Sequence, residues 1–284
     1  PKPDKRNIQH LFDNCKALNS VIVLGALQLF PSNHGRNFHM EELANEFLRR
    51  VEKNKGLRPP AWTELESIIP TCGAGLYVEP PLNPFTTNVI FRNGNNTVYP
   101  GIYNHGTHIL NEMIRVLHHD KSLPEGFTKM VSQGIGVLLE MSHQIALQLG
   151  HTRYMDVVNE SERIEFPGYE EGIKTISAIT FTKDDVIAIC DRYEISPEVI
   201  TEFLVDADLK NDDPENNILI TKPLLKDGDD IVVYSPTTIV SSLIHFAYDQ
   251  SVKHNCDTEF MKALQDEQLS VAKKAFHEMN WSLT

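Results

Sequence analysis

The chain has 284 residues, 41% of them hydrophobic and 23% charged, an ordinary globular composition that excludes a disordered chain. Its formal net charge of −13 at pH 7 argues against tight, non-specific binding to nucleic acid, which depends on neutralising phosphates. The longest apolar run, residues 21–30, is too short to span a bilayer and lies too far from the N-terminus to resemble a signal peptide.

The four cysteines favour a reduced protein over a disulfide scaffold, because they lie far apart in sequence and form no CxxC pair. They are Cys15, Cys72, Cys190 and Cys256. Together with the lack of a long apolar run, this spacing predicts a cytoplasmic protein that does not associate with membranes.

Three helices are predicted before residue 70. Apolar residues at helical spacing indicate a long amphipathic helix over residues 5–30, stopped by Pro31, and a second helix over about 39–54. A short helix is expected at 62–69. Residues 71–100 contain several prolines and little helical periodicity, so an extended region follows. Within it, Asn93-Gly94 predicts the turn of a β-hairpin near 86–100.

Residues 101–150 are predicted to form a helical hairpin around which the rest of the chain packs. Apolar residues recur every three or four positions from Thr107 to Leu117 and again from Phe127 to Leu149. Gly134 and Gly136 each cost roughly 1 kcal/mol relative to alanine in a helix unless a neighbour must approach closely. The second helix is therefore expected to be buried on more than one face.

The chain becomes acidic after residue 154, since residues 160–230 hold 19 acidic and 7 basic side chains. We place a domain boundary near 155–175. The elements expected beyond it are a strand at 177–181, a helix at 183–193 capped by Thr182, a second helix opened by Ser196-Pro197, strands at 217–225 and 230–234 around the turn 226–229, a helix from Ser235-Pro236 to Tyr248, and a last helix over 257–279.

The predicted fold class is mainly α, with an α+β part. Residues 1–160 would form a helical domain with the embedded β-hairpin. Residues 175–284 would form a smaller winged-helix-like α+β part followed by C-terminal helices. The winged-helix interpretation comes from the order strand, helix, turn, helix, strand, turn and strand over 177–234.

The charge of the second helix of this winged-helix order argues against nucleic-acid binding. Winged-helix modules often place that helix in the DNA major groove. Here it would span 197–205 and carry Glu198 and Glu202 with no basic residue, so facing phosphates would cost affinity. A protein-docking or structural module is favoured, and a nucleic-acid-binding module is an alternative.

One constellation suggests metal binding. His105 and His108 form an H-x-x-H pair, and Glu112 follows four residues later, so all three would share one helical face and could ligate a divalent metal. The glutamate and the spacing of the H-E-x-x-H metalloprotease motif are missing. The alternative is that these imidazoles cap the backbone or face solvent. No G-x-S-x-G or Walker A motif is present.

Several short stretches come in an order that resembles the N-terminal region of large, uncharacterised bacterial proteins. They are Arg58-Pro59-Pro60 with Leu65, Asn83-Pro84-Phe85-Thr86, Tyr99-Pro100-Gly101, the run from Leu138-Leu139 through Ser142, Ile145-Ala146 and Gly150 to Arg153, Lys222-Pro223-Leu224, and 230–236. Some of these proteins carry a nuclease-type or other effector domain downstream. The resemblance implies a non-catalytic region and carries over no catalytic residue.

These observations favour a non-enzymatic scaffold or protein-interaction region of a larger bacterial protein, in a defence or nuclease-associated system. Its partner would be a basic protein or a downstream domain of the same polypeptide, because the second half is acidic. No cofactor is expected. The enzymatic alternative is a metal-dependent hydrolase that uses His105, His108 and Glu112.

Overall fold

The computed structural model describes the chain in five main stretches, residues 17–29, 100–149, 169–205, 221–234 and 236–278. Before residue 100 it also describes positions 10, 14, 15, 40, 43–45, 47, 48 and 64. At residues 17, 18, 100–108, 169–173, 237, 275, 276 and 278 only the backbone is described.

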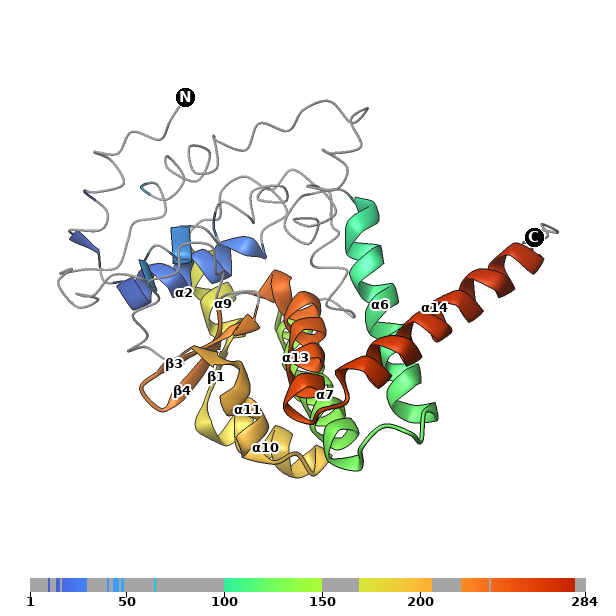
Figure 1. Ribbon diagram of the computed structural model, residues 1–284. Helices are drawn as coiled ribbons and strands as arrows, with labels where there is room; N and C mark the ends of the chain where they lie inside the picture. The colour runs from blue at the N-terminus through green and yellow to red at the C-terminus, as the bar shows by residue number, and fades with distance from the viewer. Residues whose placement is uncertain are drawn as a thin grey trace.

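Helix accounts for 78% of the described residues, and a small four-stranded mixed sheet completes the architecture (Figure 1). The predicted mainly α, α+β class is confirmed. The helices are α2 (Ala17–Gln28), α6 (Pro100–His119), α7 (Glu125–Gln148), α9 (Tyr169–Ala178), α10 (Lys183–Tyr193), α11 (Pro197–Phe203), the 3₁₀ helix η2 (Pro236–Thr238), α13 (Ile239–Lys253) and α14 (Asp257–Glu278). The strands are β1 (Thr180–Phe181), β2 (Leu204–Val205), β3 (Leu224–Asp227) and β4 (Asp230–Val233).

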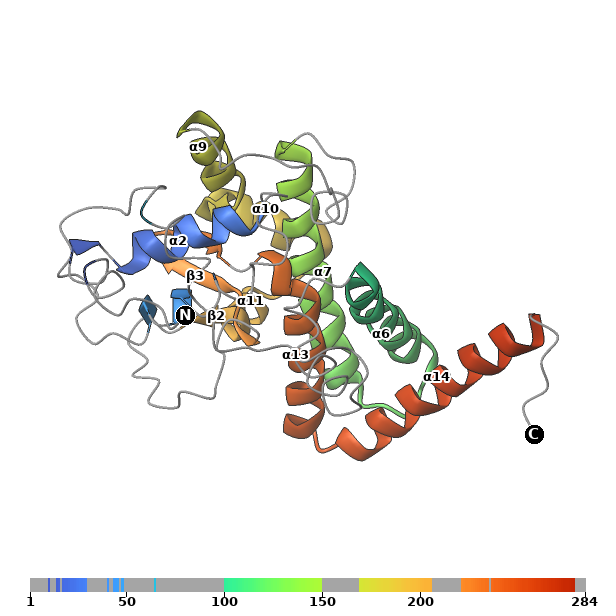
Figure 2. The same cartoon turned by 90° about the horizontal axis from the view of Figure 1, so that it is seen from above.

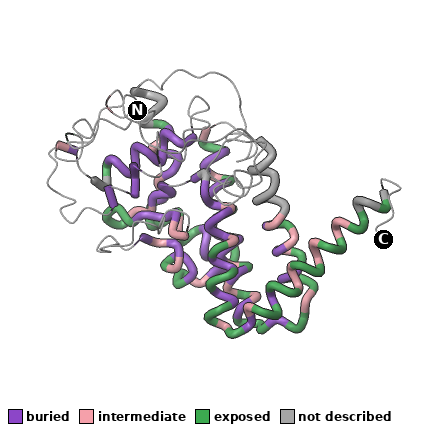
Figure 3. The backbone as a smooth tube through the Cα atoms, turned by 45° about the horizontal axis from the view of Figure 1, so that its top comes forward, coloured by how far each residue is buried: buried purple, intermediate pink, exposed green. Residues whose placement is uncertain are grey.

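Helix α7 lies at the centre of the described fold (Figure 2). It packs against α13, α10, α11, α6 and α9, and buried side chains run along it from Phe127 to Ala146. Figure 3 shows the buried segments gathered in the body of the molecule, to which α7 contributes ten buried residues spread along its length. Its apolar residues therefore meet neighbours on several sides, as the sequence predicted.

Gly134 explains how α13 comes so close to α7. A Cβ atom at this position would lie 2.4 Å from Cε1 of Phe246 and 3.1 Å from Cζ of Phe203. Nothing larger than glycine fits there without moving a buried aromatic ring. A Cβ on Gly136 would make only ordinary contact, 3.5 Å from Ile195. The sequence prediction of a close approach is thus correct for Gly134 and not for Gly136.

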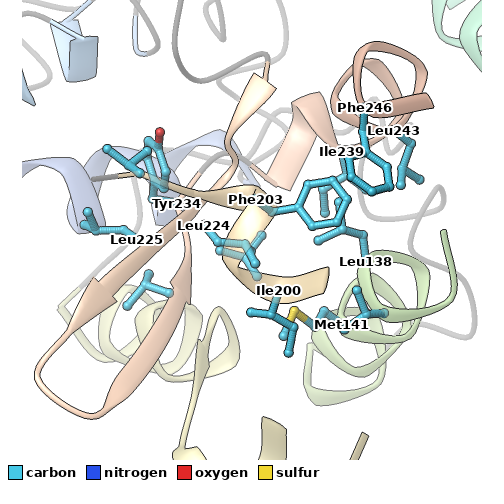
Figure 4. Packing of buried hydrophobic residues seen from close by; sticks show 14 of the residues in the cluster. Leu138, Met141, Ile200, Phe203, Leu224, Leu225, Tyr234, Ile239, Leu243 and Phe246 are labelled. Atoms are coloured by element: carbon cyan, nitrogen blue, oxygen red, sulfur yellow. The ribbon is translucent and has the colours of Figure 1, made fainter. Parts of the chain in front are cut away.

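The rings of Phe203 and Phe246 join α11 and α13 over α7, with centroids 4.5 Å apart (Figure 4). Both side chains belong to one hydrophobic cluster, which also contains Leu138 of α7 and Leu224 of β3. Each such side chain contributes about 1.5–3 kcal/mol when fully buried. The cluster draws on residues from both sides of the predicted domain boundary, and the boundary itself stays a prediction.

Helix α2 differs from the expected amphipathic helix, because residues 20–29 are buried on every side. It packs against α9 and η2. A Cβ on Gly25 would lie 2.4 Å from the backbone oxygen of Tyr234, so glycine allows the helix to touch the end of β4 directly. An apolar run with few polar residues is typical of a helix enclosed in this way.

The sheet has the strand order β1-β4-β3-β2. Strand β1 pairs antiparallel with β4, β4 with β3, and β2 lies parallel to β3. Strands β3 and β4 form a tight hairpin in which Asp227 pairs with Asp230 and Gly228 adopts a φ of 63°, a value that favours glycine. The base of this hairpin is buried and its tip is exposed.

The helices predicted at 183–193 and 257–279 agree closely with α10 and α14, whereas the helix predicted to end at Tyr248 begins as the 3₁₀ helix η2 and continues to Lys253. Two strand predictions also need correction. Residues 169–178 are helical where a strand was expected from Ser177, because the backbone N–H of Ile179 still donates to the oxygen of Thr175. Of the strand expected at 217–225, residues 217–220 lie outside the described residues, Thr221 is helical, and β3 begins at Leu224.

Several predictions lie wholly or mainly outside the described residues. These are the hairpin near 86–100, the helix at 62–69 apart from Glu64, and most of the helix at 39–54.

Candidate functional site

The predicted metal ligands all fall within α6, whose backbone is helical from Pro100 to His119. The side chains of His105 and His108 lie outside the described part of the structure, and Glu112 is half-buried. The helix preserves the spacing that the prediction requires, but whether the two imidazoles converge is not tested. The metal site therefore stays a prediction.

Among the side chains that the structure describes, no group of three or more His, Cys, Asp or Glu residues could hold a metal ion. Two described cysteines are unsuited to nucleophilic chemistry. Burial raises the pKa of the Cys190 thiol, and the negative charge of Asp191 raises it further. Burial likewise raises the pKa of Cys256, as do Glu259 and Asp257. Both thiols are therefore protonated at neutral pH, whereas a nucleophile or metal ligand must be a thiolate.

The best-defined surface lies on α10 and α11. Helix α10 begins with a capping box in which the Thr182 side chain accepts from the backbone N–H of Asp185, 3.2 Å away, and the Asp185 carboxylate accepts from the N–H of Thr182, 2.9 Å away. The helix ends at Tyr193 and is followed by the C-cap residue Glu194, whose φ of 52° is left-handed. The N–H of Ile195 returns to the carbonyl of Cys190.

Between these two ends, Asp184, Ile187 and Asp191 lie on the outward side of α10. We call these three residues the α10 face. The three residues are spaced by three and four positions, so they share one side of the helix, and all three are exposed. Ile187 is 45% exposed, an isoleucine flanked by two carboxylates. Next to this face, Glu194 and Glu198 are also exposed.

One of the two basic residues of α10 is engaged away from this face. Arg192 is directed to α7, where its Nη1 lies 3.2 Å from Oε1 of Glu140. Lys183 is the other basic residue of the helix, and α11 has none. The exposed surface of the two helices is therefore mainly acidic.

Glu140 fixes the position of α10 on α7. Its carboxylate accepts a 2.8 Å hydrogen bond from the Tyr193 hydroxyl and a 3.0 Å bond from Gln144, besides the contact to Arg192. Burial favours the neutral acid, but these hydrogen bonds and the charges of Arg192 and His143 outweigh it and hold the pKa of Glu140 below its ordinary value. The side chain is only 11% exposed, so this network is structural.

A second ion pair joins α11 to α13. Lys253 Nζ lies 2.6 Å from Oε2 of Glu202, and Gln250 Nε2 lies 3.3 Å from the same oxygen. A third contact holds the turn between α10 and α11, because the Gln133 side chain of α7 donates a 2.9 Å hydrogen bond to the backbone oxygen of Glu194. The acidic helices are thus rigidly attached to the core.

Sequence reasoning identified the acidic second helix but missed Ile187. An apolar residue can lie on either side of a helix. The packing of α10 on α7 is what shows that Ile187 points away from the core. Its placement between Asp184 and Asp191 at helical spacing was visible in the sequence.

Comparison of the chain with protein-family models, with curated proteins and with solved structures finds no match. Within the described residues, none of the helices is both long and apolar enough to cross a membrane.

Proposed function

We propose that the chain is a non-catalytic protein-interaction region whose winged-helix-like unit presents the α10 face to a basic protein partner. In keeping with the resemblance described above, it would serve as a scaffold within a larger bacterial polypeptide of a defence or nuclease-associated system. A cytoplasmic location agrees with Cys190 and Cys256, which are buried free thiols.

The topology supports the winged-helix interpretation. The order α9, β1, α10, α11 and the β3–β4 hairpin, with β1 paired to β4, is typical of such modules. Strand β2 is an addition to that pattern, because it lies parallel to β3 at the edge of the sheet.

The observation that carries the proposal is the charge of the exposed helices. A nucleic-acid reader of this topology needs basic side chains on its second helix to meet phosphates. In α11 the charged residues are Glu198 and Glu202, and Asp184 and Asp191 are exposed on α10. The same carboxylates attract a basic protein and orient it, while Ile187 offers an apolar contact at the centre of the face.

The test uses the full chain as bait, followed by affinity measurement with the purified partner. The decisive variant is Asp184→Lys with Asp191→Lys. The matched control is Asp249→Lys with Glu259→Lys, which makes the same change of net charge at exposed positions on α13 and α14. We expect the α10 variant to weaken binding roughly tenfold or more and the control to change it little. Ile187→Ser should weaken binding without altering its salt dependence.

Two outcomes would contradict the proposal. The first is equal weakening by the α10 variant and the control, which would place the partner elsewhere. The second is retention of duplex DNA at physiological salt that is lost on mutation of Lys222 or Lys226, since these lysines at the β3–β4 hairpin would then act as nucleic-acid contacts.

A further inference from the structure

Helix α14 is 22 residues long and leaves the body of the molecule (Figures 1 and 2). Its first half packs on α6 and α13, with Phe260 buried. Arg115 Nη1 of α6 lies 3.2 Å from Oε1 of Glu267, near the middle of the helix. Both views show the distal half standing away from the other described elements.

The helix has an inner and an outer face. Phe260, Leu264 and Glu267 recur at spacings of four and three on the inner face, where Phe260 packs against Phe127 of α7 and Glu267 pairs with Arg115 of α6. On the opposite side Asp266, Leu269 and Lys273 recur at spacings of three and four and are all exposed. We call these three residues the outer face. Leu269 is 50% exposed, although a leucine gains about 1.5–3 kcal/mol from full burial.

Charge is distributed unevenly along the helix. Near Leu269 on the outer side, Asp266 precedes it and Lys273 follows it; the exposed Glu259 and Lys262 lie further towards the start of the helix, and the exposed Lys274 follows Lys273. Two copies of α14 laid antiparallel and centred on Leu269 would therefore set Asp266 of each helix near Lys273 of the other. A parallel pair would set like charges together.

We propose that the outer face of α14 binds a second copy of the chain in an antiparallel, two-fold symmetric contact centred on Leu269. Asp266 and Lys273 are seven residues apart and flank Leu269, so the symmetry brings Asp266 of each helix beside Lys273 of the other. The two leucines meet at the axis, and each ion pair occurs twice.

The contact also explains how the distal half of α14 gains support. A helix segment of about ten residues without tertiary contacts has little stability of its own in water, so a partner would stabilise it. A single helix pair buries less surface than a standard interface of about 1,600 Å². The dimer is therefore weak and depends on protein concentration.

The experiment measures sedimentation equilibrium of the full chain and its variants over a wide range of concentration. The wild-type chain should pass from monomer to dimer. Leu269→Glu should raise the dissociation constant roughly tenfold or more, because it puts two carboxylates at the axis. The control Leu147→Glu changes a leucine of α7 that is 53% exposed and should leave dimerisation unchanged.

A charge exchange tests the orientation. Asp266→Lys alone and Lys273→Asp alone each place like charges at both symmetric contacts, so each should weaken the dimer. The double variant restores opposite charges and should recover most of the lost affinity. In a parallel contact the double variant would bring no recovery.

A chain that remains monomeric at high concentration would overturn the proposal and leave the outer face for a different protein. So would dimerisation that Leu269→Glu does not affect, or a double charge variant no better than either single one. Circular dichroism of each variant should match the wild type, and a dimer lost only together with helix content would also count against the proposal.

Discussion

Two long helices, α7 and α14, have similar apolar periodicity but different surroundings. Helix α7 is 24 residues long and is enclosed by five other helices of the described fold. Helix α14 is nearly as long, and its inner face alone is covered along the first half. Periodicity thus shows which residues share a face, but the length and direction of neighbouring helices decide how much of that face is buried.

The largest expected effect on stability comes from comparing a substitution of the buried Phe203 with one of the exposed Leu269. Phe203→Ala should destabilise the protein by about 3–5 kcal/mol, because it removes a buried ring that packs on Phe246. Leu269→Ala at low protein concentration should change stability by about 0.5 kcal/mol or less. Urea denaturation measures both. Similar losses for the two variants would mean that α14 is as well packed as α7.

The next effect compares two glycines of α7. Gly134→Ala should cost about 1–3 kcal/mol, because the new methyl group collides with the ring of Phe246. Gly136→Ala meets only ordinary contact at Ile195 and should stabilise the helix by up to about 1 kcal/mol. Thermal unfolding of the two variants gives the comparison. A stabilised Gly134→Ala would show that α13 lies further from α7.

These glycines also show how far sequence reasoning reaches. A glycine inside a helical pattern predicts a close neighbour, yet it does not say which neighbour or which of two glycines matters. The apolar run 20–29 predicted a helix, while its enclosure on every side depends on α9, η2 and Tyr234, which are distant in sequence. The strand at 177–181 was overpredicted because its apolar residues suit a helix end equally well.

The candidate surface was less accessible from sequence than the fold. The excess of acidic residues after 160 was plain, and the exposed positions of Asp184 and Asp191 follow from the helix that Thr182 caps. That Arg192 turns away from this surface depends on Glu140, which lies 52 positions earlier in the chain. Local sequence cannot indicate such a contact.

Glu140 gives a prediction that depends on pH. Because its pKa is lowered in the folded chain, the carboxylate stabilises the protein above the ordinary glutamate pKa of about 4.3, and this contribution is lost as pH falls through the lower folded value. Glu140→Gln should therefore cost about 1–3 kcal/mol at pH 7. The difference from wild type should shrink below pH ~4. Denaturation across this range is the measurement, and a pH-independent difference would contradict the assignment.

The smallest effect concerns the N-terminal caps of α10 and α11. Thr182→Ala should cost about 1 kcal/mol, because the Thr182 side chain caps α10. Ser196→Ala should cost less, since Ser196 makes no side-chain cap hydrogen bond at the start of α11. Thermal denaturation of the pair gives the difference. A larger loss for Ser196→Ala would contradict the capping geometry.

Hydrogen exchange read by mass spectrometry tests most directly the claim that α7 is the rigid centre while α14 is held only in part. Amides in the middle of α7 should exchange only through global unfolding. Amides of α14 beyond Leu269 should exchange fast in dilute protein and more slowly in concentrated protein. Equal, concentration-independent protection of the two helices would contradict the account.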